Sequence, residues 1–222
     1  MSFSPMDSGG HDTRLRPRSQ NGNRPAGLES RLAPGSLVST PIHPIPTEAS
    51  AWVRRFAPLV RPGGSVLDLA CGGGRHARFF AARGHAVEAV DRDAALVAAL
   101  AGVTGVNATL ADLEGGPWPY AGREFDAVVV TNYLHRPLFA PILDALAPRG
   151  VLLYETFMAG NERFGRPANP EYLLHPGELL ERVAGRLSVI AFEQGEVERP
   201  KRCVVQRICA FAGAPPVRLP EP

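Results

Sequence analysis

The sequence lacks any apolar run of the roughly 20 residues that a membrane-crossing helix needs, and its N-terminus lacks the apolar core of a secretory signal. We therefore expect a soluble, cytoplasmic protein. Cysteine is scarce as well. Cys71, Cys203 and Cys209 are an odd number without the spacing of a metal site, which favours a reducing compartment and predicts no bound metal.

Neither sign of charge is in excess. The 24 basic and 22 acidic residues leave a net charge of +2, so no charge field marks a dedicated nucleic-acid binder, and we expect no nucleic-acid partner. With 222 residues, of which 45% are hydrophobic, the chain fits one domain with a substantial core. A second full domain has no room.

The two ends of the chain differ in composition from its middle. Residues 1–46 are rich in Gly, Pro, Ser and Arg without periodicity, a composition that buries too little apolar surface to order itself. We expect an unstructured extension there, with an RNA-contacting arm or a targeting peptide as alternatives that its acidic residues disfavour. The predicted domain covers residues 47–212, and a Pro-rich tail covers residues 213–222.

Strand and helix patterns alternate through this predicted domain, which indicates an α/β fold. The last two strands lie closer together in sequence than a crossover helix allows, so we expect them to form an antiparallel pair at the sheet edge. The expected strands begin at Val66 and continue with residues 86–90, 106–110, 125–130, 151–155, 187–192 and 202–211, and the expected helices lie behind Thr47 and over residues 75–83, 93–100, 138–146 and 176–184.

The most informative stretch begins at Val66, where a short apolar strand carrying Asp68 runs into three glycines, residues 72–74. Glycine lets the backbone approach a ligand, and the first turn of the following helix offers free N–H groups. The loop also fits the G-x-G-x-x-A dinucleotide pattern, but a carboxylate aimed at it would repel a pyrophosphate and attract a cationic amino group. S-adenosylmethionine (SAM) carries such an amino group and no phosphate. Asp91, at the end of the next strand, is placed to accept both ribose hydroxyls.

On the run from Asp68 to Asp91, the sequence resembles the class I SAM-dependent methyltransferases, and the resemblance extends over residues 47–211. Residues 68–76 are most similar to the tellurite-resistance and thiopurine-type small-molecule methyltransferases, and residues 176–179 to the former group. The resemblance implies a Rossmann-like seven-stranded sheet, mostly parallel with an antiparallel C-terminal edge pair and helices on both faces. It also implies SAM as cofactor and a small-molecule methyl acceptor. The cofactor-binding residues that it implies are Asp68, Ala70, Cys71, Gly72, Gly74, Asp91, Arg92, Asp112, Leu113 and Asn132.

Two segments are candidates for binding the acceptor. Tyr133 and His135 follow the fourth strand and are expected to orient the acceptor or take its proton, although His135 equally fits a histidine without a role. Residues 155–172 leave the C-terminal edge of the sheet, where α/β folds bind ligands. Four residues there are expected to close over the acceptor, and the arginines among them favour an anionic one: Asn161, Arg163, Arg166 and Tyr172. In the structural alternative, Arg163 pairs with an acidic residue of the same loop.

Two other functions stay open. One is methylation of RNA or protein, against which the missing Asn-Pro-Pro-Tyr or Asp-Pro-Pro-Tyr pattern counts. The other is a non-catalytic SAM-binding regulatory or partner subunit, which intact glycines and acids do not exclude. Both a monomer and a homodimer are compatible with the sequence.

Overall fold

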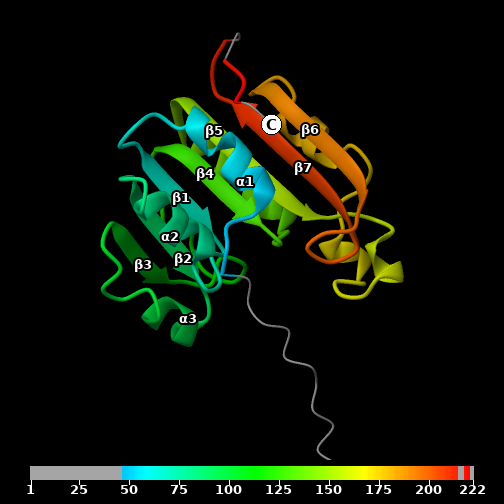
Figure 1. Cartoon of the computed structure of the whole chain (residues 1–222), viewed down its shortest axis with the longest axis horizontal. Helices are drawn as coiled ribbons and strands as arrows, with labels where there is room; N and C mark the ends of the chain where they lie inside the picture. Colours follow the sequence, from blue (N-terminus) through cyan, green and yellow to red (C-terminus); the bar gives the residue numbers. More distant parts are fainter. Residues whose placement is uncertain (1–46, 215–217, 221–222) are drawn as a thin grey trace, which may run out of the picture. The chain divides into compact units, whose positions relative to one another are not determined.

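The computed structural model describes residues 47–214 and 218–220. The extension expected over residues 1–46, and part of the expected tail, lie outside these ranges. The described chain forms a seven-stranded sheet in the order β3-β2-β1-β4-β5-β7-β6 (Figure 1). The strands are β1 (Ser65–Leu69), β2 (Ala86–Asp91), β3 (Val106–Leu110), β4 (Phe125–Thr131), β5 (Leu146–Phe157), β6 (Ser188–Val197) and β7 (Cys203–Phe211).

The first five strands pair in parallel, and β7 runs antiparallel to both β5 and β6. The expected fold is therefore confirmed, including the antiparallel C-terminal pair. The central strands are buried on both faces, and the unbroken apolar run of β4, with Ala127 to Val130 fully buried, reflects this position.

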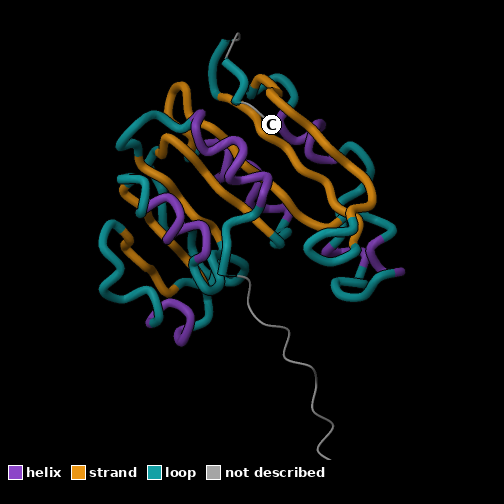
Figure 2. Tube along the Cα trace, in the orientation of Figure 1, coloured by secondary structure: helices purple, strands orange, loops and turns teal. Residues whose placement is uncertain are grey.

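The helices are short, as the tube in Figure 2 shows. They are α1 (Ala51–Phe56), α2 (Arg75–Ala81), α3 (Ala94–Ala98), α4 (Phe139–Asp144) and α5 (Glu178–Val183), with 3-10 turns η1 (Ala57–Leu59), η2 (Arg136–Leu138), η3 (Asn161–Arg163) and η4 (Pro170–Tyr172). Two α-helices begin with side-chain caps: Ser50 accepts from the Val53 amide, and Asp93 accepts from the amides of Ala95 and Leu96. No helix in the described ranges is both long and apolar enough to span a membrane.

The helices cover both faces of the sheet and form two hydrophobic clusters. One contains Trp52 and Phe56 from α1 and Phe80 from α2, and Figure 1 shows α1 and α2 lying across the near face of the sheet. The other contains Phe139 from α4 and Leu179 from α5, packed on the opposite face. Alternation along β1 explains the division, because Val66 points into the first cluster whereas Leu67 and Leu69 point into the second.

Several expected bounds differ from those of the structure, including the end of α4 and the start of β5. The helix expected over residues 138–146 ends at Asp144, and residues 147–150, expected as a loop, lie within β5. The strand accommodates them because its register with β4 shifts there, with Arg149 in the left-handed region at φ 66°. Hydrogen bonds between this irregular segment and Ala212, just after β7, hold it in the sheet.

Candidate functional site

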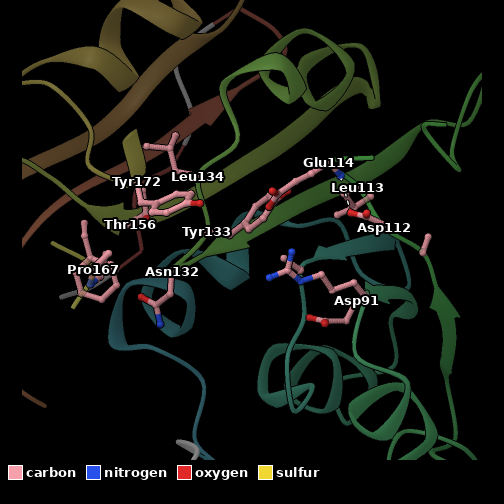
Figure 3. A pocket seen from close by; sticks show the side chains of 14 residues that line it. Asp91, Asp112, Leu113, Glu114, Asn132, Tyr133, Leu134, Thr156, Pro167 and Tyr172 are labelled. Carbon is pink, nitrogen blue, oxygen red and sulfur yellow. Dashed lines mark hydrogen bonds between the residues drawn. The ribbon is translucent and has the colours of Figure 1, made fainter. Parts of the chain in front are cut away.

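A cavity of about 420 Å³ opens at the carboxyl ends of the parallel strands, next to the point where the strand order reverses between β1 and β4. Ligands of open α/β sheets bind at this place. Each of the five parallel strands contributes to the lining through the residues that follow or end it (Figure 3). The lining consists of Ala70, Asp91, Arg92, Ala111, Asp112, Leu113, Glu114, Asn132, Tyr133, Leu134, Thr156, Phe157, Pro167 and Tyr172.

Two lining residues have an unusual backbone. Ala70 follows β1 at φ 51°, and Asn132 follows the neighbouring β4 at φ 55°. The left-handed region costs a residue with a Cβ about 1 kcal/mol, less for asparagine, and such strain gathers at functional sites. The Cys71 amide donates to the Val90 carbonyl and the Asn132 amide to the Glu155 carbonyl, so both turns are anchored on adjacent strands.

The two outer glycines of the loop serve different purposes. Gly72, at φ 53°, would carry a Cβ with no atom within 4 Å, so open space lies beside its backbone. A Cβ on Gly74, at φ 72°, would instead overlap the side chain of Leu100. Gly72 therefore leaves room for a ligand, whereas Gly74 allows α2 to begin close to the end of α3.

Asp91 lines the cavity in a fixed orientation. Its Oδ2 accepts from the Gly72 amide at 2.8 Å, and its Oδ1 accepts from the Asp93 amide at 3.0 Å. Each carboxylate oxygen keeps a second lone pair for a ligand hydroxyl. The strand-end acid and the glycine loop, 19 residues apart in sequence, thus form one unit.

Asp68 lies beneath the loop and does not line the cavity. It is 1% exposed, and its Oδ2 accepts from the Ala77 amide at 2.9 Å, in the first turns of α2. Strand alternation places this side chain on the face that α2 covers, and so it does not reach the lining. Burial raises the pKa of Asp68 to about 8, although the Ala77 amide opposes the change. Its evident role is to hold the start of α2.

The segment after β3 places Asp112 both at the cavity and in a turn. Asp112 and Leu113 line the cavity, and Asp112 Oδ1 also caps a turn by accepting from the Glu114 amide at 3.0 Å. The amides of Glu114 and Gly115 lower the pKa of Asp112. An ionised carboxylate, able to accept hydrogen bonds, therefore stands at this end of the cavity.

Tyr133 and His135 lie in different environments. Tyr133 lines the cavity, and its buried hydroxyl has no hydrogen-bond partner in residues 47–214 and 218–220. Burial, and then the nearby Glu114 carboxylate, raise the pKa of Tyr133, so at neutral pH this phenol stays protonated, can donate to a ligand and does not act as a base. His135 precedes the turn η2 and lies outside the lining.

The structure does not bring Asn161 and Arg163 to the cavity. Asn161 is 1% exposed, donates to the Pro167 carbonyl and accepts from the Val204 amide, so it anchors the loop to β7. Arg163 donates to the Gly160 carbonyl and lies 3.9 Å from Glu196, not beside an acid of its own loop.

Cys71 is buried, and burial raises the pKa of its thiol, which makes it a packing residue. Neither Cys71 nor Gly72 nor Gly74 contributes to the lining.

Several lining residues were not singled out from the sequence. Thr156, Phe157 and Pro167 belong to the segment 155–172 that was expected near the acceptor, but no pattern distinguished them from their neighbours. Glu114 follows Leu113 and Leu134 follows Tyr133, both of which were predicted site residues. Their position close to the end of a strand was the signal that could have identified them.

An ion-pair network fixes the wall of the cavity that carries Tyr172. Arg136 makes a bidentate pair with Glu178, with both N–O distances at 2.9 Å, and also donates to the carbonyls of Glu171 and Leu173. Arg182 donates to the same Glu178, which is 3% exposed. The network ties the segment after β4 to the turn η4 and to the start of α5, so this wall is built before any ligand arrives.

Comparison with known proteins agrees with the fold. Residues 66–150 match the family model described as a methyltransferase domain. A search of curated proteins finds no match. Among solved structures, TehB from Haemophilus influenzae is 18% identical with a TM-score of 0.62, over 73% of this chain and 62% of that chain. The chain thus spans less than two thirds of that protein.

Two further structures are similar. A SAM-dependent methyltransferase from Methanosarcina mazei is 13% identical with a TM-score of 0.58, over 76% of this chain and all of that chain. The glycopeptide N-methyltransferase MtfA, complexed with S-adenosylhomocysteine, is 21% identical with a TM-score of 0.53, over 74% and 90% of the two chains. At these identities the likeness establishes a shared fold.

Proposed function

Because residues 66–150 carry a methyltransferase domain and the described chain has the class I methyltransferase fold and resembles TehB, we propose that this protein is a SAM-dependent methyltransferase of a small-molecule acceptor. The observation that carries the proposal is the cavity at the strand ends, where Asp91 is fixed by the glycine loop beside open space at Gly72. A related fold holds S-adenosylhomocysteine in its structure.

The residues fit the parts of SAM one by one. The open space at Gly72 admits the methionine end, and Ala70 and Asn132 present strained backbone on either side of it. Asp91 has free lone pairs for the ribose hydroxyls. Asp112 offers an ionised carboxylate to the amino group of adenine, and Leu113 an apolar contact to its ring.

When bound, SAM supplies a sulfonium methyl group, which forms a bond to the acceptor's lone pair while the sulfur–carbon bond breaks and leaves its electron pair on sulfur. The task left to the protein is positioning. Asn132 and Tyr133 lie between the cofactor end and the remaining wall, so they would orient the acceptor. An acceptor that must lose a proton would pass it to water, since Tyr133 is protonated and His135 lies outside the lining.

The proposal is tested by calorimetric titration of the full chain with S-adenosylhomocysteine. Micromolar binding is expected, and Asp91→Ala should weaken it at least tenfold. Glu124→Gln is the matched control, since this exposed acid lies outside the cavity. A folded protein that does not bind the probe would refute the proposal. Binding without transfer to any acceptor in a screen would point instead to a regulatory subunit.

A further inference from the structure

The end of the cavity away from Asp91 carries no charged side chain. Leu134, Thr156, Phe157, Pro167 and Tyr172 form it, and Figure 3 shows the labelled members of this set on one side of Tyr133, with Asp91, Asp112 and Glu114 on the other. We infer that the methyl acceptor is a neutral molecule with a flat apolar body, and this inference rests on the proposed function. The set is called the acceptor wall below.

Charge is confined to the cofactor end. The lining there contains Asp91, Asp112, Glu114 and a single cation, Arg92. An anionic acceptor against the acceptor wall would lose water without gaining a cationic partner, which is costly. A cationic acceptor against the wall would likewise lack an anionic partner, because the lining carboxylates lie on the other side of Tyr133.

The arginines that suggested an anionic acceptor are directed elsewhere. Arg163 is exposed and engaged with Gly160 and Glu196, and Arg166 is exposed outside the lining. Arg136 approaches this side of the cavity, but its guanidinium is occupied by Glu178 and two carbonyls.

The charged groups behind the acceptor wall are also neutralised. Glu155, which precedes Thr156 on β5, is 7% exposed and pairs with Arg207 at 2.6 Å. Burial lowers the pKa of Arg75, and the charge of the nearby Glu155 opposes this change. Glu155 is therefore paired beneath the wall and is not left as an isolated charge.

Shape and size complete the inference. Phe157 and Tyr172 offer aromatic surface and Pro167 a rigid apolar ring, which favour contact with a planar ligand. Tyr172 is 50% exposed in the described structure, an unusual exposure for a large aromatic side chain, and a ligand would cover part of it. A cavity of about 420 Å³ that also takes the cofactor favours a small acceptor.

Three probes with one ring system test the charge preference: 2-naphthol, 2-naphthoate and 2-naphthylmethylamine, which at pH 7 are neutral, anionic and cationic. Each is titrated by calorimetry into the full chain saturated with S-adenosylhomocysteine. We expect 2-naphthol to bind at least tenfold more tightly than either charged probe. Tyr172→Ala should weaken naphthol binding severalfold, and Leu180→Ala, which truncates an exposed side chain on α5 outside the cavity, should not.

Equal or tighter binding of the naphthoate, weakened by Arg166→Ala, would overturn the inference, as would equal binding of the amine or no binding of any probe. The cofactor titration separates this failure from failure of the proposed function. If S-adenosylhomocysteine does not bind, the proposed function fails, and the same probes on the free protein still measure the preference of the acceptor wall.

Discussion

Replacing Glu178 with glutamine should destabilise the protein by about 2 to 3 kcal/mol at neutral pH, and by less as the solution is acidified. Burial would raise the pKa of this carboxyl, but donors from Arg136, the His175 amide and Arg182 outweigh burial and lower it from 4.5 to about 2. Each tenfold change in proton affinity is worth about 1.4 kcal/mol, which gives the expected loss. Because Arg136 and Arg182 are 28% and 39% exposed, screening by water reduces the loss toward about 2 kcal/mol.

The sign of the pH dependence follows from the lowered pKa. The ionised form is favoured in the folded state, so the stabilisation is complete above the unfolded value of 4.5 and is lost as the pH falls toward 2. By pH 3 the difference between wild type and Glu178→Gln should be about half its neutral value or less.

Urea unfolding followed by circular dichroism at pH 7, 5 and 3 measures this difference. Glu181→Gln is the matched control, since Glu181 lies exposed on the same helix and makes no ion pair in the described structure. A difference that stays constant down to pH 3, or a Glu178→Gln protein within about 0.5 kcal/mol of wild type, would refute the reasoning.

Three other predictions concern the site. Gly74→Ala should lower the free energy of unfolding in urea by about 2 kcal/mol, because of the positive φ and the overlap with Leu100. Gly72→Ala should lower it by about 1 kcal/mol and mainly weaken S-adenosylhomocysteine binding. Equal losses of stability in the two variants would contradict the packing argument. Burial, and then the charge of Arg75, lower the pKa of His76 to about 3, so NMR should find its ring neutral at pH 5. Since the unfolded state gains this proton below about pH 6.5, stability should fall as the pH decreases from there, and a His76→Gln protein should lack this component. Tyr133→Phe should leave urea stability within about 0.5 kcal/mol, because the hydroxyl has no partner among residues 47–214 and 218–220 to lose.

The regular elements were largely predictable from the sequence because they depend on local patterns. The expected third strand, residues 106–110, has the bounds of β3, and Asp93 caps α3 as its position before an apolar run indicated. Strand ends also located the cavity, since Ala70, Asp91 and Asn132 all line it. These inferences require only periodicity, capping and the rule that parallel strands end at one edge.

Side-chain direction and long-range pairing were not predictable. Asp68 and Asp91 both stand near strand ends, yet only the pleat decides that one is covered by α2 and the other faces the cavity. From the sequence, Asn161 has the character of a polar loop residue. Its burial follows from packing against β7, some 40 residues later, where the Val204 amide donates to its side chain. The pair of Arg136 with Glu178 likewise joins residues 42 positions apart, for which a single sequence holds no signal.

The insertion of β7 between β5 and β6 has a consequence for biosynthesis. A nascent chain that has reached β6 but not Cys203 presents β5 with an open edge, and with it Thr156 and Phe157 of the cavity. An unpaired apolar strand edge invites association with other chains. The protein can therefore complete its sheet only late in translation, and truncation before β7 should yield aggregation and not a partly active domain.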